Sequence, residues 1–148
     1  MPGVILEGFD ELQDAFKAIG SIPATVSRQA VKAMGEAAKN AVKAQGESMG
    51  VRSSESGPHL LDHIDVSRPK KGRDGNMKSF VTFTGVRRSG KSRIWNAAIA
   101  YLVEYGAPRR GIPARPFIAT AMERYADEIS APADEIIGGW IEETYQNT

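Results

Sequence analysis

The chain has 148 residues, of which 41% are hydrophobic and 25% are charged, values typical of a single packed domain. They exclude a wholly disordered chain, and the absence of cysteine excludes disulfides, thiolate metal sites and a cysteine nucleophile. The 19 basic and 18 acidic side chains leave a net charge of +1, a total that by itself suggests no anionic partner. The first residues lack the pattern of a signal peptide, and no stretch has the roughly 20 apolar residues of a membrane helix. We therefore expect a soluble protein that works or is assembled inside a cell, with no membrane contact.

The N-terminal third is predicted to be mainly helical. A short apolar strand is expected at 4–6, followed by a helix at 10–19 that ends before Gly20 and Pro23. A long helix is expected over 24–49, because small apolar residues recur there every three or four positions. This alanine-rich stripe buries little area but lets a neighbouring backbone approach closely, and it consists of Val26, Ala30, Ala33, Ala37, Ala41 and Ala44.

The middle of the chain has strand patterns separated by basic, turn-rich segments. A loop rich in serine and glycine is expected at 50–58, and a half-buried strand at 64–66. Basic connections are expected at 69–76 and 87–93, on either side of a strand at 78–86. The segment 97–105 fits a helix by its apolar spacing and a strand by its length.

The last third is predicted to be helical. After a loop at 106–113, Pro116 suits the first position of an amphipathic helix that Phe117 anchors in the core and that runs to Ile129. Pro132 is expected to start a separate last helix, which two glycines at 138–139 weaken by roughly 1 kcal/mol each. The whole pattern predicts one α+β domain over 1–148, with a small antiparallel sheet packed against the long N-terminal helix and a helical C-terminus.

A phosphate-loop pattern, GxxxxGK[ST], begins at Gly85 and is matched at every specified position. In such a site Lys91 contacts the β- and γ-phosphates and Ser92 binds magnesium, so a small nucleotide hydrolase is one alternative function. The surroundings argue against it, because the chain after Ser92 reads mostly as helix and no apolar strand ending in aspartate follows. The competing interpretation is a basic hairpin loop that contains two glycines.

Other candidate chemistry is weaker. His59 and His63 stand four residues apart, as two metal ligands on one helical turn would, but Pro58 and the following strand pattern interrupt that helix. Solvated or capping histidines are the simpler interpretation, and Glu142 and Glu143 are most simply solvent-facing. No arrangement of serine, histidine and aspartate places a nucleophile. We therefore expect no enzyme activity, no cofactor and no metal.

The net charge of +1 conceals a strong asymmetry along the chain. Residues 1–51 carry a net charge of −1, residues 52–115 of +8 and residues 116–148 of −6. The basic clusters could contact phosphates, meet an acidic surface on a partner or a second copy, or simply be solvated. No aromatic residue interleaves them, which weakens an interpretation as a single-strand binder, whereas contact between basic and acidic regions of successive copies builds rings. The clusters are Lys70, Lys71 and Arg73; Arg87, Arg88, Lys91 and Arg93; and Arg109 and Arg110.

Two sequence boxes in the last third resemble a known family. The first is an aromatic-x-x-Glu-aromatic-Gly box at 101–106, and the second is an Ala-Arg-Pro-Phe box that opens a helix within 112–121. They resemble the tail-component family of long-tailed bacteriophages, the neck or tail-completion proteins akin to lambda-type minor tail protein Z. The segment 4–12 and, more loosely, 54–64 match further boxes of the family, while Ala107 stands where threonine is usual. The matching residues are Glu104, Gly106, Ala114, Arg115, Pro116 and Phe117.

The resemblance implies a virion structural protein at the head–tail junction of a tailed phage or prophage, which acts by assembly and without turnover. It implies a ring of identical subunits, a hexamer, that binds connector or head-completion proteins and tail-terminator or tail-tube proteins. The protein would then lie in the virion, and in the host cytoplasm during assembly. A non-specific nucleic-acid-binding module that uses the basic loops is the third alternative, beside the nucleotide hydrolase.

The boxes also make physical sense residue by residue. Gly106 permits a sharp exit of the backbone after a packed aromatic pair, Tyr101 and Tyr105. Arg115 either pairs with Glu104 across the loop, as a rigid bidentate ion pair, or both side chains are exposed and unpaired.

Overall fold

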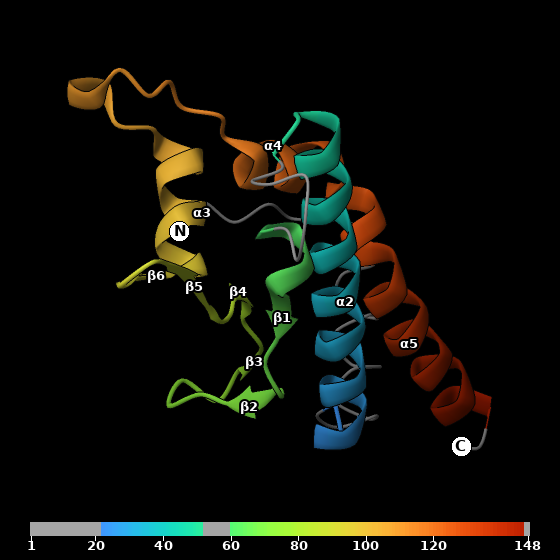
Figure 1. Cartoon of the computed structure of the whole chain (residues 1–148). Helices are drawn as coiled ribbons and strands as arrows, with labels where there is room; N and C mark the ends of the chain where they lie inside the picture. Colours follow the sequence, from blue (N-terminus) through green and yellow to red (C-terminus); the bar gives the residue numbers. More distant parts are fainter. Residues whose placement is uncertain (1–21, 52–59, 147–148) are drawn as a thin grey trace.

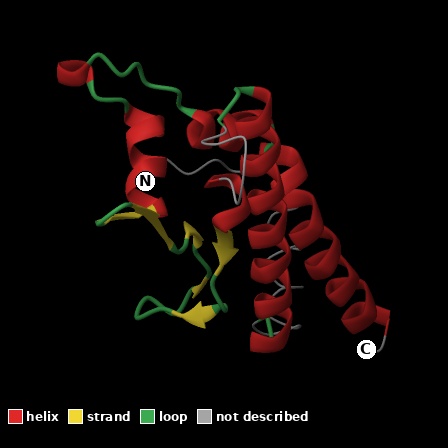
Figure 2. Ribbon diagram, in the orientation of Figure 1, coloured by secondary structure: helices red, strands yellow, loops and turns green. Residues whose placement is uncertain are grey.

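The computed structural model describes residues 22–51 and 60–146, which combine helices with three small antiparallel strand pairs (Figure 1). Two long helices, α2 (Ala24–Ser48) and α5 (Ala126–Gln146), pack against each other, and α2 also contacts the strands. In Figure 2 the strands lie to one side of α2 and α5 lies to the other. The predicted α+β class is therefore confirmed, with a long N-terminal helix and a helical C-terminus. The strand expected at 4–6 and the helix expected at 10–19 lie outside the described residues.

Helix α2 confirms the long helix expected from the alanine stripe, but its buried face is rotated from that stripe. Ala30 and Ala41 are buried as expected, whereas Ala44 is exposed. The close approach falls at two glycines instead, because a Cβ on Gly35 would lie 2.6 Å from a methyl carbon of Val66 and one on Gly46 would lie 2.6 Å from a methyl carbon of Leu61. The small residues of α2 therefore do what the stripe predicted, at positions that apolar spacing alone does not mark.

The first strands form one long two-stranded ribbon. After the short 3-10 helix η1 (Leu60–His63), strand β1 (Ile64–Val66) pairs with β4 (Val81–Phe83), and β2 (Lys70–Lys71) pairs with β3 (Met77–Lys78). From Val66↔Val81 to Lys70↔Lys78 one strand advances four residues and the other three, so the ribbon contains a bulge. Pro69 lies in this bulge, where the lack of an amide hydrogen costs no ladder bond. The single strand expected at 78–86 is therefore wrong: it is interrupted at 79–80, between β3 and β4, and it ends at Phe83, before Gly85 with a φ of +86°.

The second basic segment, expected as a connection, is itself a hairpin. Strands β5 (Val86–Ser89) and β6 (Ser92–Trp95) pair antiparallel around a two-residue turn, in which Gly90 has a φ of +62°. The chain then enters α3 (Asn96–Tyr105), so the ambiguous segment 97–105 is a helix. Asn96 is buried and joins the start of α3 to the segment after β4, because its Nδ2 donates a hydrogen bond of 2.8 Å to the Thr84 carbonyl.

The C-terminal helices break at a different residue from the one expected. Helix α4 (Phe117–Arg124) is followed by Tyr125 as its C-cap, and α5 starts at the next residue and runs through Pro132 without interruption. The prediction that Pro132 starts the last helix is wrong because tertiary packing outweighs the local preference. Ile129 and Ala133, on either side of the proline, are both buried where the helix packs against its neighbours.

The apolar core gathers around Phe117, which is fully buried and meets Phe83 edge-to-face with ring centroids 6.0 Å apart. This confirms the expectation that Phe117 anchors its helix in the core. The other core residues come from α2, η1, β1, α3, α4 and the start of α5, and include Val42, Leu60, Leu61, Ile64, Ala100, Ala121 and Ile129. Among the helices within the described ranges, none is long and apolar enough to cross a membrane.

Candidate functional site

Glu104 has a specific structural task at the junction between α3 and α4. The residue is only 6% exposed, and its carboxylate accepts hydrogen bonds from the backbone amides of Ile118 at 2.8 Å and Ala119 at 3.0 Å. These are the second and third amides of α4, which a local capping side chain normally satisfies. The residue before α4 is Pro116, which makes no side-chain cap. Glu104 therefore caps α4 from the preceding helix.

Neither expectation for Glu104 and Arg115 is correct. Glu104 is buried and bonded to backbone, and the structure shows no ion pair between these two described side chains. Arg115 is exposed, and its guanidinium donates at 3.4 Å to the carbonyl of Gly50, while its own amide donates to Val103 at 2.7 Å. The helix N-terminus is the better partner for the carboxylate, since it offers two amides and the positive end of the helix dipole.

The other box residues hold the loop between α3 and α4 in place. Gly106 has a φ of +69°, and a Cβ there would lie 2.6 Å from the amide nitrogen of Ala114. Only glycine fits this position, so the expected sharp exit after α3 is confirmed. Pro116 lies at the N-cap rather than at the first helical position, so that prediction is off by one residue. Gly106 therefore allows the two ends of the loop between α3 and α4 to lie close together.

The outward face of α3 carries an exposed aromatic pair. Tyr101 and Tyr105 lie one helical turn apart with ring centroids 4.7 Å from each other, and 67% and 65% of their surfaces are accessible. They contact each other, so the expected packed aromatic pair is confirmed, although both side chains are exposed. Trp95, just before the helix, is 65% exposed as well. Ordered, exposed tyrosine and tryptophan side chains are typical of interfaces. We call Trp95, Tyr101 and Tyr105 the aromatic face.

The phosphate-loop pattern does not adopt the structure that its chemistry requires. Gly85 precedes β5 with a φ of +86°, Lys91 lies in the hairpin turn and Ser92 begins β6. A phosphate site needs a loop that wraps the phosphates and a helix that begins at the Lys-Ser pair. Here an antiparallel strand follows, and the next helix begins at Asn96. The competing prediction of a hairpin is confirmed.

The basic residues are divided between two ribbons. Arg88 and Arg93 are directly opposite each other on the β5–β6 hairpin, with Arg87 beside them. Lys70 and Lys71 form β2, and Arg73 lies in the turn that follows. The remaining predicted cations, Arg109 and Arg110, lie in η2 (Pro108–Arg110), at the exposed tip of the loop after α3 (Figure 1).

Three residues of the β2–β3 ribbon were not identified as candidate site residues from the sequence. Arg68, Lys78 and Phe80 line one pocket together with Lys70 and Lys71. An aromatic side chain does therefore lie among one of the basic clusters, contrary to the expectation. The available signal was the period of two, since Lys78 and Phe80 are two residues apart and alternate residues of a strand share a face.

No metal centre is found within the described ranges. No group of three or more histidine, cysteine, aspartate or glutamate side chains is arranged to hold an ion in residues 22–51 and 60–146. His63 is partly buried at the end of η1, and its carbonyl accepts from the amide of Thr84 at 2.7 Å. His59 lies outside the described residues.

Comparisons with known proteins give no match to a family model, to a curated protein or to a solved structure.

Proposed function

We propose that this chain is a virion structural protein at the head–tail junction of a tailed phage or prophage, where copies assemble into a ring. The boxes at 101–106 and 112–121 suggest the class of particle. The observation that carries the assembly proposal is the aromatic face beside a hairpin that presents Arg88 and Arg93. Aromatic and arginine side chains dominate the binding energy of protein interfaces. Two arginines directly opposite each other also repel, and an acidic partner relieves that repulsion.

The surface that complements this face is the acidic outer side of α5 in the next copy. Its exposed carboxylates include Glu142 and Glu143, and α5 contains no lysine or arginine. Helix α3, which carries Tyr101 and Tyr105, and helix α5 lie on opposite sides of the molecule in Figure 1. Contact between them is therefore head-to-tail, and a head-to-tail contact closes into a ring when the rotation allows. The resemblance implies six copies.

The function proposed is assembly by shape and charge complementarity, without turnover. The ring would bind connector or head-completion proteins on one side and tail-terminator or tail-tube proteins on the other, as the resemblance implies. The protein would be found in the virion, and in the host cytoplasm before assembly. Mass spectrometry of particles from the strain that carries the gene tests this location, and absence of the chain from purified particles overturns it.

A charge exchange tests the ring contact. Reversing the charge of the hairpin with Arg88→Glu and Arg93→Glu should reduce the oligomer to monomers, because like charges then face each other across the contact. Reversing α5 with Glu142→Lys and Glu143→Lys should do the same, and the chain that carries all four changes should recover the oligomer. Light scattering measures the mass, and electron microscopy shows the rings. Loss of mass that the fourfold variant does not restore, or no loss at all, contradicts the contact.

A further inference from the structure

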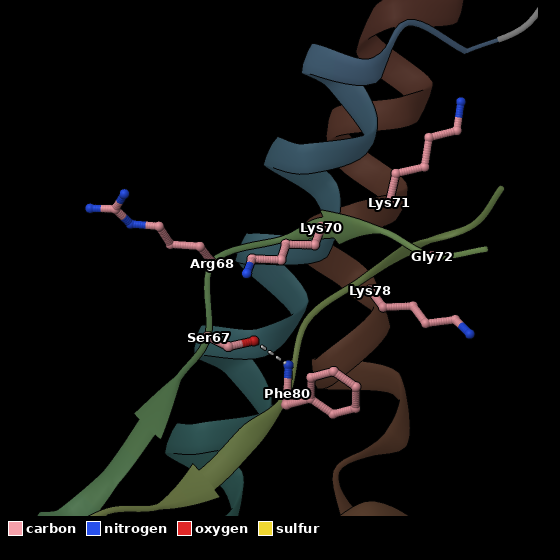
Figure 3. Close-up of a pocket in the computed structure, with 7 residues that line it drawn as sticks. All are labelled: Ser67, Arg68, Lys70, Lys71, Gly72, Lys78 and Phe80. Carbon is pink, nitrogen blue, oxygen red and sulfur yellow. Dashed lines mark hydrogen bonds between the residues drawn. The ribbon is translucent and has the colours of Figure 1, made fainter. Parts of the chain in front are cut away.

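The outward side of the β2–β3 ribbon is hollowed by a pocket of about 550 Å³ (Figure 3). Small-molecule and nucleotide sites commonly have volumes of several hundred Å³. The side chains that line it come from the bulge, from both strands and from the start of the turn: Ser67, Arg68, Lys70, Lys71, Gly72, Lys78 and Phe80. The proposed ring contact uses none of these residues.

The pocket carries a strong excess of positive charge. Between residues 67 and 80 the chain has five cations and one carboxylate, a net charge of +4. The carboxylate, Asp74, is bound by Lys78 at 2.9 Å, and this contact holds the pKa of Asp74 below its ordinary value. Lys70 lies directly opposite Lys78 in the ladder, so two ammonium groups flank the same stretch of ribbon. In Figure 3 the basic side chains leave the ribbon in different directions, Arg68 and Lys70 to one side and Lys78 to the other, so they can meet separate anionic groups.

Phe80 adds an aromatic surface that is both exposed and held. The residue is 64% exposed, which is unusual for a phenylalanine. Its backbone is fixed on both sides: the Phe80 amide donates to Ser67 Oγ at 2.8 Å, and the Ser67 amide donates to the Phe80 carbonyl at 2.8 Å (Figure 3). Lys78 and Phe80 are two residues apart on the chain and line the same pocket. A ring is thereby presented to solvent next to cations.

We propose that this pocket binds single-stranded nucleic acid, with phosphates on Arg68, Lys70 and Lys71 and an unpaired base stacked on Phe80. Basic side chains that follow the backbone, joined to an aromatic ring on which a base can stack, are what single-strand binding proteins use. An acidic protein surface would satisfy the cations but would leave the phenylalanine ring without a partner. A duplex offers phosphates but keeps its bases stacked on each other. A single strand, unlike a duplex or an acidic protein surface, uses both parts of the pocket.

Fluorescence anisotropy with a labelled oligothymidylate tests the proposal on the full chain. Replacing Phe80 with serine should weaken binding about 5- to 150-fold, the range that stacking one base on an aromatic ring spans. Replacing it with leucine should weaken binding almost as much, because leucine is apolar but has no ring face, whereas tyrosine should preserve binding. The double change Lys70→Gln and Lys71→Gln should reduce the salt dependence, lowering the slope of log K against log salt by about 1.4.

Two controls distinguish binding at this pocket from the effects of the other basic residues and of oligomerisation. Arg109→Gln removes one cation from the tip of the η2 loop, at the far end of the molecule in Figure 1, and should leave the affinity for the oligonucleotide and the salt slope unchanged. The Phe80 variants should keep the oligomeric mass of the unaltered chain, so that loss of nucleic-acid binding and loss of the ring are told apart. The proposal is overturned if duplex DNA binds as tightly as the single strand. It is also overturned if Phe80→Ser has no effect, or if polyglutamate competes as well as the oligonucleotide.

Discussion

Removal of the Glu104 carboxylate should unfold the junction between α3 and α4 before the rest of the protein. The helix that it caps has only eight residues and has no local side-chain cap. Helices this short are not stable on their own, so α4 depends on packing and on its cap. Glu104→Ala takes away both acceptors of the Ile118 and Ala119 amides at once.

The size of the effect follows from the two hydrogen bonds. A hydrogen bond to a charged partner contributes about 1.5–3 kcal/mol, and loss of a capping side chain typically costs about 0.5–2 kcal/mol. Because the two bonds share one carboxylate they do not add fully, and we expect Glu104→Ala to lower the free energy of unfolding by about 3 kcal/mol. Glu104→Gln keeps one acceptor oxygen but turns an amide toward the second donor, so we expect about half that loss.

Urea unfolding followed by circular dichroism measures these differences, with Glu36→Ala as the control. Glu36 is an exposed carboxylate on α2, outside the proposed ring contact, and its removal should change stability by less than about 0.5 kcal/mol. Hydrogen exchange adds a local readout, because the Ile118 and Ala119 amides should exchange faster in the Glu104 variants than their neighbours in the core. The reasoning fails if Glu104→Gln is as stable as the unaltered chain, or if those two amides keep their protection.

The glycines give further predictions, all measured by thermal or urea unfolding. Gly106→Ala should cost about 3 kcal/mol or more, because the new Cβ meets backbone atoms at a positive φ, whereas Gly111→Ala, with a similar φ and open space, should cost only about 1 kcal/mol. Equal losses at the two positions would contradict this account. Gly46→Ala should destabilise by about 1–2 kcal/mol, since its Cβ would lie 2.6 Å from Leu61 Cδ2. Gly138→Ala, on the open side of α5, should instead stabilise by nearly 1 kcal/mol through helix propensity, and a loss there would show that this glycine has an unseen contact.

The fold could be predicted where the signal was local and long. The alanine periodicity of α2 runs over seven turns, and the strand at 64–66 alternates cleanly, so both were found. The last helices were harder, because Pro132 carries a strong local preference for a helix start. Only the contacts of Ile129 and Ala133 with the rest of the protein overcome it, and those contacts are absent from the local sequence pattern.

The candidate sites could be predicted only in part, for a related reason. Charge density marked Lys70 and Lys71 correctly, since counting needs no structure. The pocket they share with Phe80 depends on a bulge and a turn that bring residues ten apart into one place. In the same way, Glu104 was singled out, but its partners are amides, which are invisible in a sequence because every residue except proline has one.

Two sets of backbone hydrogen bonds join the two sides of the loop between α3 and α4 at its base. Ala107 and Ile112 exchange backbone hydrogen bonds of 2.9 and 3.1 Å, and the Arg115 amide is bonded to the Val103 carbonyl. The exposed tip at 108–111 is therefore isolated from the core, and changes in it leave the fold intact. Substitutions at 108–111 should therefore change what this exposed tip can contact while the backbone that holds it stays the same.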